Sequence, residues 1–112
     1  MQITERREGS ILVIAVEGRL DNAGSDIFRE TALCRIQEGA RSLIVDFSKT
    51  DFIASMGIRA LFIPAQELAR VKGRIVLSGL NAELKNLFLI GGLLDLFQVF
   101  ENVDKAVADT KW

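Results

Sequence analysis

The feature that most constrains this chain is a regular alternation of short apolar runs with segments of helical periodicity, punctuated by glycines. Continuous apolar runs between turn residues are typical of strands that are buried on both faces of a sheet. Strands that alternate with amphipathic helices predict an α/β fold with a mostly parallel sheet, and a polar first strand followed by a tight turn predicts an antiparallel N-terminal edge. The expected strands cover residues 2–8, 11–16, 42–47, 74–78 and 98–100.

About four helices are expected between and after these strands. Ser25, Ser55, Asn81 and Asn102 precede or open the helical segments, and residues of these types commonly cap a helix N-terminus. Pro64 falls inside the second helix, which we expect to continue with a bend because its apolar stripe stays in phase on both sides. The residues expected to face the core are Phe28, Ala32, Leu33 and Ile36 in the first helix, Ile58, Leu61, Phe62, Ala65, Leu68 and Ala69 in the second, and Leu84, Leu87 and Phe88 in the third.

Composition limits what such a domain can do. The chain has 112 residues, of which 49% are apolar, so we expect one domain with one hydrophobic core over residues 1–112. Fourteen basic against fifteen acidic residues leave a net charge of −1, which argues against a nucleic-acid or anionic membrane surface. We also expect a cytoplasmic protein, since no apolar leader or membrane-length stretch is present and a single cysteine, Cys34, rules out an internal disulfide.

Catalysis is not expected either. The chain has no histidine, and therefore lacks the imidazole that most hydrolytic triads and many metal sites use. Asp46 and Asp51 flank the end of a strand but have no nucleophile or metal-ligand cluster near them in the sequence. Cys34 is expected to be a partly buried, inert thiol. We predict no catalytic residue, no metal and no cofactor.

The most informative stretch is a polar loop, expected over residues 48–54, that leads into Ser55 at the start of the second helix. Ligands and partners of open α/β sheets gather at the carboxyl ends of the strands, which is where this loop should lie. Ser55 either caps the N-terminus of this helix or exposes its hydroxyl to a binding partner. Gly57 would leave the backbone beside it open to a partner, and Arg59, one turn along, could pair with a phosphate on Ser55.

The outer face of the second helix carries apolar and basic side chains together. Met56, Arg59, Ile63 and Arg70 fall at helical spacing on this face, opposite the core stripe. A merely solvated face would usually lack Met and Ile. This face is therefore a candidate for docking a partner, for pairing with a second copy as a homodimer, or for burial under another helix of the same chain.

Three segments, in this order, resemble the stand-alone STAS domain of the anti-sigma factor antagonist family. Gly18-Arg19-Leu20-Asp21 is similar to the family's turn after the second strand. Ile44-Val45-Asp46-Phe47, followed by Ala54-Ser55-Met56-Gly57-Ile58, resembles its strand and phosphorylation loop. Residues 84–100 resemble its leucine-rich helix and the phenylalanine-containing segment that follows this helix. The resemblance spans the chain and implies a STAS-like fold.

The resemblance also implies a mechanism of partner switching. An unphosphorylated antagonist binds a histidine-kinase-like serine kinase that is also an anti-sigma factor, and thereby releases its client. Phosphorylation of the serine that matches Ser55 ends this binding, and a PP2C-type phosphatase restores it. The residues expected in or near the docking surface are Asp21, Asn22, Ala54, Met56, Gly57, Arg59 and Ile63.

The chain departs from the family pattern on both sides of Ser55. Ala54 and Met56 stand where the family usually has an aspartate and often a serine. Two other functions therefore stay open. One is a constitutive, non-phosphorylated STAS accessory subunit of a transport or signalling complex, which needs a permanently exposed apolar patch. The other is an enzyme or small-molecule carrier, which needs a closed polar pocket.

Overall fold

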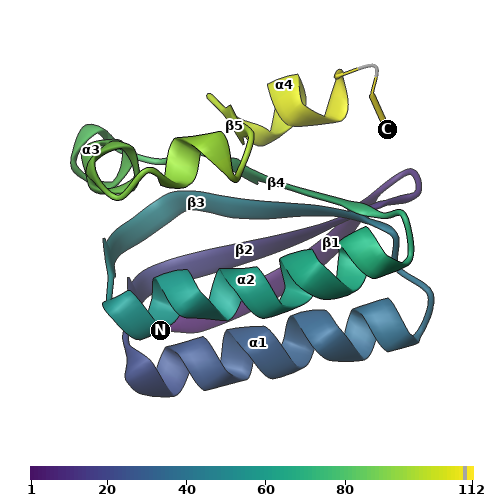
Figure 1. The fold of residues 1–112 in the computed structure, drawn as a ribbon, viewed down its shortest axis with the longest axis horizontal. Helices are drawn as coiled ribbons and strands as arrows, with labels where there is room; N and C mark the ends of the chain where they lie inside the picture. Colours follow the sequence, from purple (N-terminus) through teal and green to yellow (C-terminus); the bar gives the residue numbers. More distant parts are fainter. Residues whose placement is uncertain (110) are drawn as a thin grey trace.

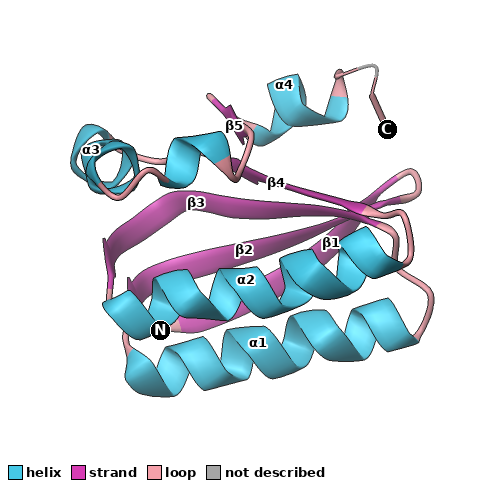
Figure 2. Cartoon of the chain, in the orientation of Figure 1, coloured by secondary structure: helices cyan, strands magenta, loops and turns pink. Residues whose placement is uncertain are grey.

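In the described residues a five-stranded mixed sheet and four α-helices form the α/β arrangement that the alternation predicts (Figures 1 and 2). The computed structural model describes residues 1–109 and 111–112. The strand order is β1-β2-β3-β4-β5, with β1 antiparallel to β2 and the other pairs parallel. The elements are β1 (Gln2–Glu8), β2 (Ile11–Leu20), α1 (Asn22–Gln37), β3 (Ser42–Ile53), α2 (Ser55–Arg70), β4 (Arg74–Ser78), α3 (Ala82–Ile90), the short 3₁₀ helix η1 (Leu93–Asp95), β5 (Val99–Phe100) and α4 (Val103–Val107).

The sheet separates two apolar clusters. Helices α1 and α2 lie side by side on one face (Figure 1), and residues of α3 and η1 join the same cluster. Crossovers between parallel strands are right-handed, so successive crossover helices in this strand order fall on one face. Helix α4 packs on the other face, over Ile11, Val13, Ile44 and Val76. Strand β2 is therefore buried from both sides, which explains its unbroken apolar run.

Strand β3 is six residues longer than the sequence predicts. The expected loop over residues 48–54 is wrong, because all of it except Ala54 belongs to the strand. Two bulges, between the pairs Ala15–Asp46 and Glu17–Lys49 and again before Phe52, let polar side chains turn outward while the backbone keeps pairing with β2. The buried Thr50 hydroxyl donates to the Val16 carbonyl at 2.6 Å. The bulges carry β3 to the start of α2.

Helix α2 is drawn as one continuous helix in Figure 2. Pro64 lies within it and is buried. Its inner face is formed by Gly57, Ala60, Leu61, Pro64 and Leu68. This face is rotated slightly from the expected stripe, so Ala69 is exposed and not part of the core.

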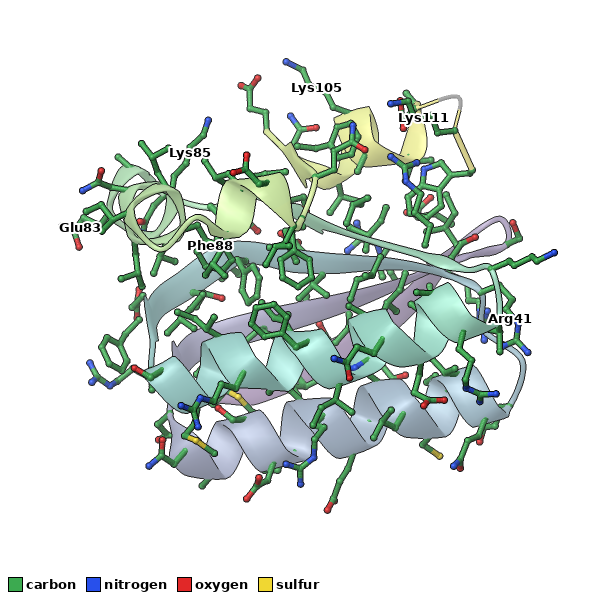
Figure 3. The ribbon with its side chains drawn as sticks, viewed as in Figure 1. Arg41, Glu83, Lys85, Phe88, Lys105 and Lys111 are labelled. Atoms are coloured by element: carbon green, nitrogen blue, oxygen red, sulfur yellow. The ribbon has the colours of Figure 1, made fainter. Side chains whose placement is uncertain are left out.

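Helix α3 begins as predicted, with the Asn81 side chain accepting a hydrogen bond from the Leu84 amide at 2.9 Å, and it ends before Gly91. Figure 3 shows Phe88 pointing inward and Glu83 and Lys85 pointing away. Leu84 and Phe88, one turn apart, anchor this short helix in the core. Leu87 was expected beside them, but its side chain lies to one flank of that stripe and is exposed.

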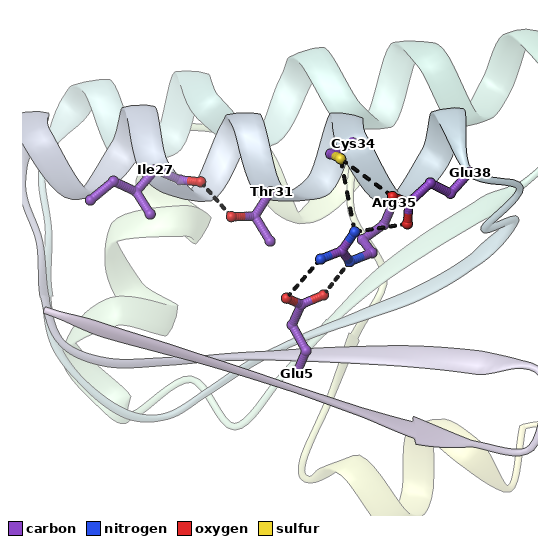
Figure 4. Close-up of polar contacts among 6 residues, drawn as sticks. All are labelled: Glu5, Ile27, Thr31, Cys34, Arg35 and Glu38. Carbon is purple, nitrogen blue, oxygen red and sulfur yellow. Dashed lines mark hydrogen bonds and ion pairs between the residues drawn. The ribbon is translucent and has the colours of Figure 1, made fainter.

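The edge strand β1 is held to α1 by a charged cluster (Figure 4). Arg35 pairs with Glu5 of β1 and with Glu38 of its own helix, each at 2.7 Å. The hydrogen bond to Glu5, and then that to Glu38, raise the pKa of the Arg35 guanidinium above its usual range. Cys34 lies beside this cluster and is exposed, so the expectation that it is partly buried is wrong. Its Sγ lies 3.8 Å from Arg35 Nη1 and 3.6 Å from a Glu38 oxygen.

Candidate functional site

The candidate site lies at the edge of the sheet where β2 and β3 end. Leu20 and Ile53 are register partners at the ends of these parallel strands, and the Ala54 amide donates to the Leu20 carbonyl at 2.9 Å. Each strand is followed directly by a helix: α1 begins after Asp21, and α2 begins after Ala54. The fold thus brings together two segments that are more than 30 residues apart in the sequence.

Ser55 is exposed and forms the first residue of α2. The N-cap position belongs to Ala54, and no side chain of the described residues caps this end. The interpretation of Ser55 as the N-cap is therefore wrong. The amides at the start of an α-helix point outward without intrahelical partners, and the helix dipole places partial positive charge there. In α2 the Gly57 amide donates to the Ala54 carbonyl at 2.8 Å, and the exposed Ser55 lies beside the two amides that precede it, those of residues 55 and 56.

Gly57 does not have the role that the sequence suggests. Its backbone is buried, so it does not leave an open approach for a partner. A Cβ at this position would lie 2.9 Å from Ile53 Cγ2 and 3.0 Å from two atoms of Leu20. Glycine is needed here because the first turn of α2 packs directly on the ends of β3 and β2. Gly57 supports the site from inside the protein.

Asp21 is exposed and caps α1: its carboxylate accepts a hydrogen bond from the Gly24 amide at 2.8 Å. The prediction that Ser25 caps this helix is wrong, because the helix starts three residues earlier, at Asn22, and Ser25 is buried in its first turn. The Ser25 hydroxyl donates instead to the Asp21 carbonyl at 2.6 Å. Asn22 is exposed next to the cap. Both residues therefore lie at the same edge as Ser55.

Two substitutions at Asp21 should show whether its capping hydrogen bond or its negative charge stabilises the fold. Asp21→Ala should lower the free energy of unfolding by about 1 kcal/mol, because the amides of the first turn lose their acceptor. Asp21→Asn should stay within about 0.5 kcal/mol of the wild type, since asparagine caps as well as aspartate. Urea denaturation followed by circular dichroism measures both. Equal losses in the two variants would contradict the capping role.

The outer face of α2 is solvent-exposed, which removes the option that another helix of the described chain covers it. Met56 and Ile63 are each 41% exposed, and Arg59 lies between them on the same face. Together with side chains of α1 they line a groove that starts beside Ser55. It is formed by Ser25, Asp26, Arg29, Met56, Arg59, Ala60 and Ile63.

Two further residues of this edge were not predicted from the sequence. The Arg19 guanidinium lies over the Phe52 ring, 4.3 Å from its centroid, and Phe52 is 39% exposed. These residues are register partners at the ends of β2 and β3. The second bulge of β3 sets this pairing, so strand patterns in the sequence do not reveal it. The pair adds an aromatic and a cationic group to the edge that carries Ser55.

The described part of the chain contains no group of three or more Cys, Asp or Glu residues placed to hold a metal ion. No helix among the described residues is both long and apolar enough to cross a bilayer. The groups exposed at this edge include the Ser55 hydroxyl, the Asp21 carboxylate, the guanidinium groups of Arg19 and Arg59, and apolar side chains, with the first amides of α2 beside them.

Comparison with known proteins finds one family model and a relative that both match nearly the whole chain. The family model described as STAS domain matches residues 2–106. The BtrV protein of Bordetella bronchiseptica, whose name describes an anti-sigma factor antagonist, is 26% identical over 111 residues, covering 99% of this chain and 96% of the relative.

Solved structures share the fold. The phosphorylated form of the Bacillus cell fate determinant SpoIIAA superimposes with a TM-score of 0.76 at 22% identity, covering 95% of this chain and 96% of that one. The Thermotoga maritima protein TM1081 reaches a TM-score of 0.88 at 10% identity, covering 93% and 90% of the two chains.

Proposed function

Because this chain belongs to the STAS domain family, we propose that it is an anti-sigma factor antagonist that acts by partner switching. In its unphosphorylated form it binds a histidine-kinase-like serine kinase that also serves as an anti-sigma factor, and the client of that kinase is released. Phosphorylation of Ser55 ends the binding, and a PP2C-type phosphatase reverses the modification. The name of its relative BtrV supports this general role.

The observation that carries the proposal is the exposed Ser55 hydroxyl at the uncapped start of α2. A phosphate placed there would meet outward-pointing amides and the positive end of the helix. It would therefore be tolerated by the folded protein, and its effect would fall on whatever docks at this edge. The modification adds nearly two negative charges. The fold is shared with SpoIIAA, which has been solved in a phosphorylated form.

In this proposal the chain is a substrate and a binding partner, and it is not an enzyme. The groups at the site are suited to being recognised: a hydroxyl, a cation and exposed Met56 and Ile63 side chains. The kinase and the phosphatase supply the catalytic groups.

Ala54 and Met56 change how the serine is presented. An aspartate at residue 54 would occupy the N-cap of α2 and compete with a phosphate for the same amides. Alanine has no side-chain oxygen to bond these amides, so the departure from the family pattern is compatible with a phosphate on Ser55. Met56 adds apolar contact area directly beside the hydroxyl.

The proposal is tested by incubating the protein with its kinase and ATP. Intact-mass analysis should show the addition of one phosphate to the wild type and none to Ser55→Ala. Ser25→Ala is not a suitable control because Ser25 is buried, whereas the exposed Ser10→Ala should be phosphorylated like the wild type. If an active kinase adds no mass to the wild type, the phosphorylation switch is wrong.

A second candidate, a constitutive STAS subunit of a larger complex, is favoured by a different surface. Leu89, Ile90 and Leu96 of the α3–η1 segment are 61%, 78% and 63% exposed. Several large, exposed aliphatic side chains within one short stretch of chain are a candidate surface for another protein to cover. Such a subunit would bind its partner equally well whether or not Ser55 carries a negative charge.

A further inference from the structure

The groove beside Ser55 continues along the contact between α1 and α2. Near the start of α2 it is a depression of about 170 Å³, and a second one of about 280 Å³ follows it. Ile63 lines both, so the two depressions adjoin at this side chain on the outer surface of the helix pair. The second depression is lined by Leu33, Ile36, Gln37, Ile63 and Glu67.

The groove has an apolar floor and a rim of charges. Leu33, Ala60 and Ile63 provide aliphatic surface along its length. At the rim, Arg29 pairs with Asp26 at 3.3 Å, and Glu67 pairs with Arg70 at 2.9 Å. None of the salt bridges among the described residues includes Arg59, which is exposed beside Met56. The groove therefore offers one uncommitted cation at its Ser55 end.

Building on the function proposed above, we infer that this groove binds an amphipathic segment of the kinase partner and that Arg59 is the residue through which phosphorylation releases it. The segment places apolar side chains on Ala60 and Ile63 and a carboxylate on Arg59. Charge complementarity and continuity with Ser55 both favour this occupant. A segment lying in the reverse direction would bring its carboxylate to Glu67.

Arg59 is placed to serve both states of the switch. Ser55 and Arg59 are four residues apart on α2, and side chains at this spacing lie next to each other on one face of a helix. In the unphosphorylated protein the guanidinium is available to the partner's carboxylate. A phosphate on Ser55 carries more charge than a carboxylate and is tethered beside Arg59, so it takes over the guanidinium. It also repels the partner's acidic group.

The experiment measures kinase binding by isothermal titration calorimetry for four proteins. Arg59→Glu and Ile63→Gln should each weaken binding by about tenfold or more, because one reverses the charge and the other removes apolar contact. Arg7→Glu is the matched control. It makes the same charge reversal at an exposed arginine of β1 that lies outside the groove lining, and it should stay within about twofold of the wild type. The three side chains that are replaced are exposed, and circular dichroism verifies that each variant folds.

A double-mutant cycle tests the link to phosphorylation. Ser55→Glu should weaken binding much less in the Arg59→Gln background than in the wild type, because the added charge then has no guanidinium to compete for. If wild-type protein binds and is phosphorylated but Arg59→Glu and Ile63→Gln bind as tightly as the wild type, the groove inference is wrong and the proposed function stands. Additive effects of Ser55→Glu and Arg59→Gln would overturn the competition. Wild-type protein that neither binds nor accepts phosphate would overturn both.

Discussion

Gly79→Ala should lower the free energy of unfolding by about 3 kcal/mol, a large loss of stability for the addition of one methyl group. Gly79 closes β4 with φ of +76°, a backbone conformation that costs an alanine roughly 1–2 kcal/mol. A Cβ there would also lie 2.8 Å from the backbone nitrogen of Ser48 and 2.9 Å from its Cα. Such backbone atoms cannot move aside without disturbing the bulge in β3, which adds about 1–3 kcal/mol.

Gly9→Ala is the matched control. Gly9 also has a positive φ, +64°, but no described atom lies within 4 Å of a Cβ built on it. Its substitution should therefore cost only the conformational part, about 1 kcal/mol. Urea titrations of both variants measure the difference. Equal losses would show that the approach of β4 to the β3 bulge does not contribute to stability.

Ser55→Glu should weaken kinase binding by roughly a hundredfold while leaving the midpoint of thermal unfolding within about 2 °C of the wild type. Like charges brought together in an interface cost several kcal/mol, and a hundredfold change corresponds to about 2.7 kcal/mol. The fold should be unaffected because Ser55 is exposed and because a carboxylate is favourable in the first turn of a helix. Surface plasmon resonance and differential scanning calorimetry measure the two quantities.

Ser10→Glu provides the control for this prediction. Ser10 is exposed in the turn between β1 and β2, at the amino end of β2, whereas Ser55 follows the carboxyl end of β3. The same charge change there should leave kinase binding unaltered. Equal weakening in both variants would indicate a general effect of net charge. Equal affinity of Ser55→Glu and the wild type would instead favour the constitutive subunit, whose contact would then involve Leu89, Ile90 and Leu96.

Local sequence signals predicted most of the fold. Asn81 and Asn102 cap α3 and α4 through their side chains, as expected, because a cap depends on amides only two or three residues away. The boundaries of β1 and β4 agree with the prediction, since turn residues end these strands directly. The antiparallel edge and the parallel centre follow from the same alternation.

The errors concern residues whose state depends on distant partners. The stretch of residues 48–53 has a polar, turn-like composition, yet its backbone pairs with β2 through two bulges. Ser25 is predicted from the sequence to cap α1, but the helix begins earlier and its N-cap is Asp21, whose side chain accepts a hydrogen bond from the Gly24 amide. The inward faces of α3 and α1 follow the predicted periodicity, but Leu87 and Cys34 lie at the flanks of those faces and are exposed.

The sequence by itself determined the class of fold, the order of its elements and the position of Ser55 at the start of a helix, because hydrophobic period and capping chemistry act over a few residues. Only the tertiary structure decided the form of the site. It buried Gly57 against Leu20 and Ile53, stacked Arg19 on Phe52, and placed α1 beside α2 to form a groove whose lining includes Met56, the neighbour of Ser55. These contacts join residues far apart in the chain, and they depend on strand register and helix packing, which no local pattern specifies.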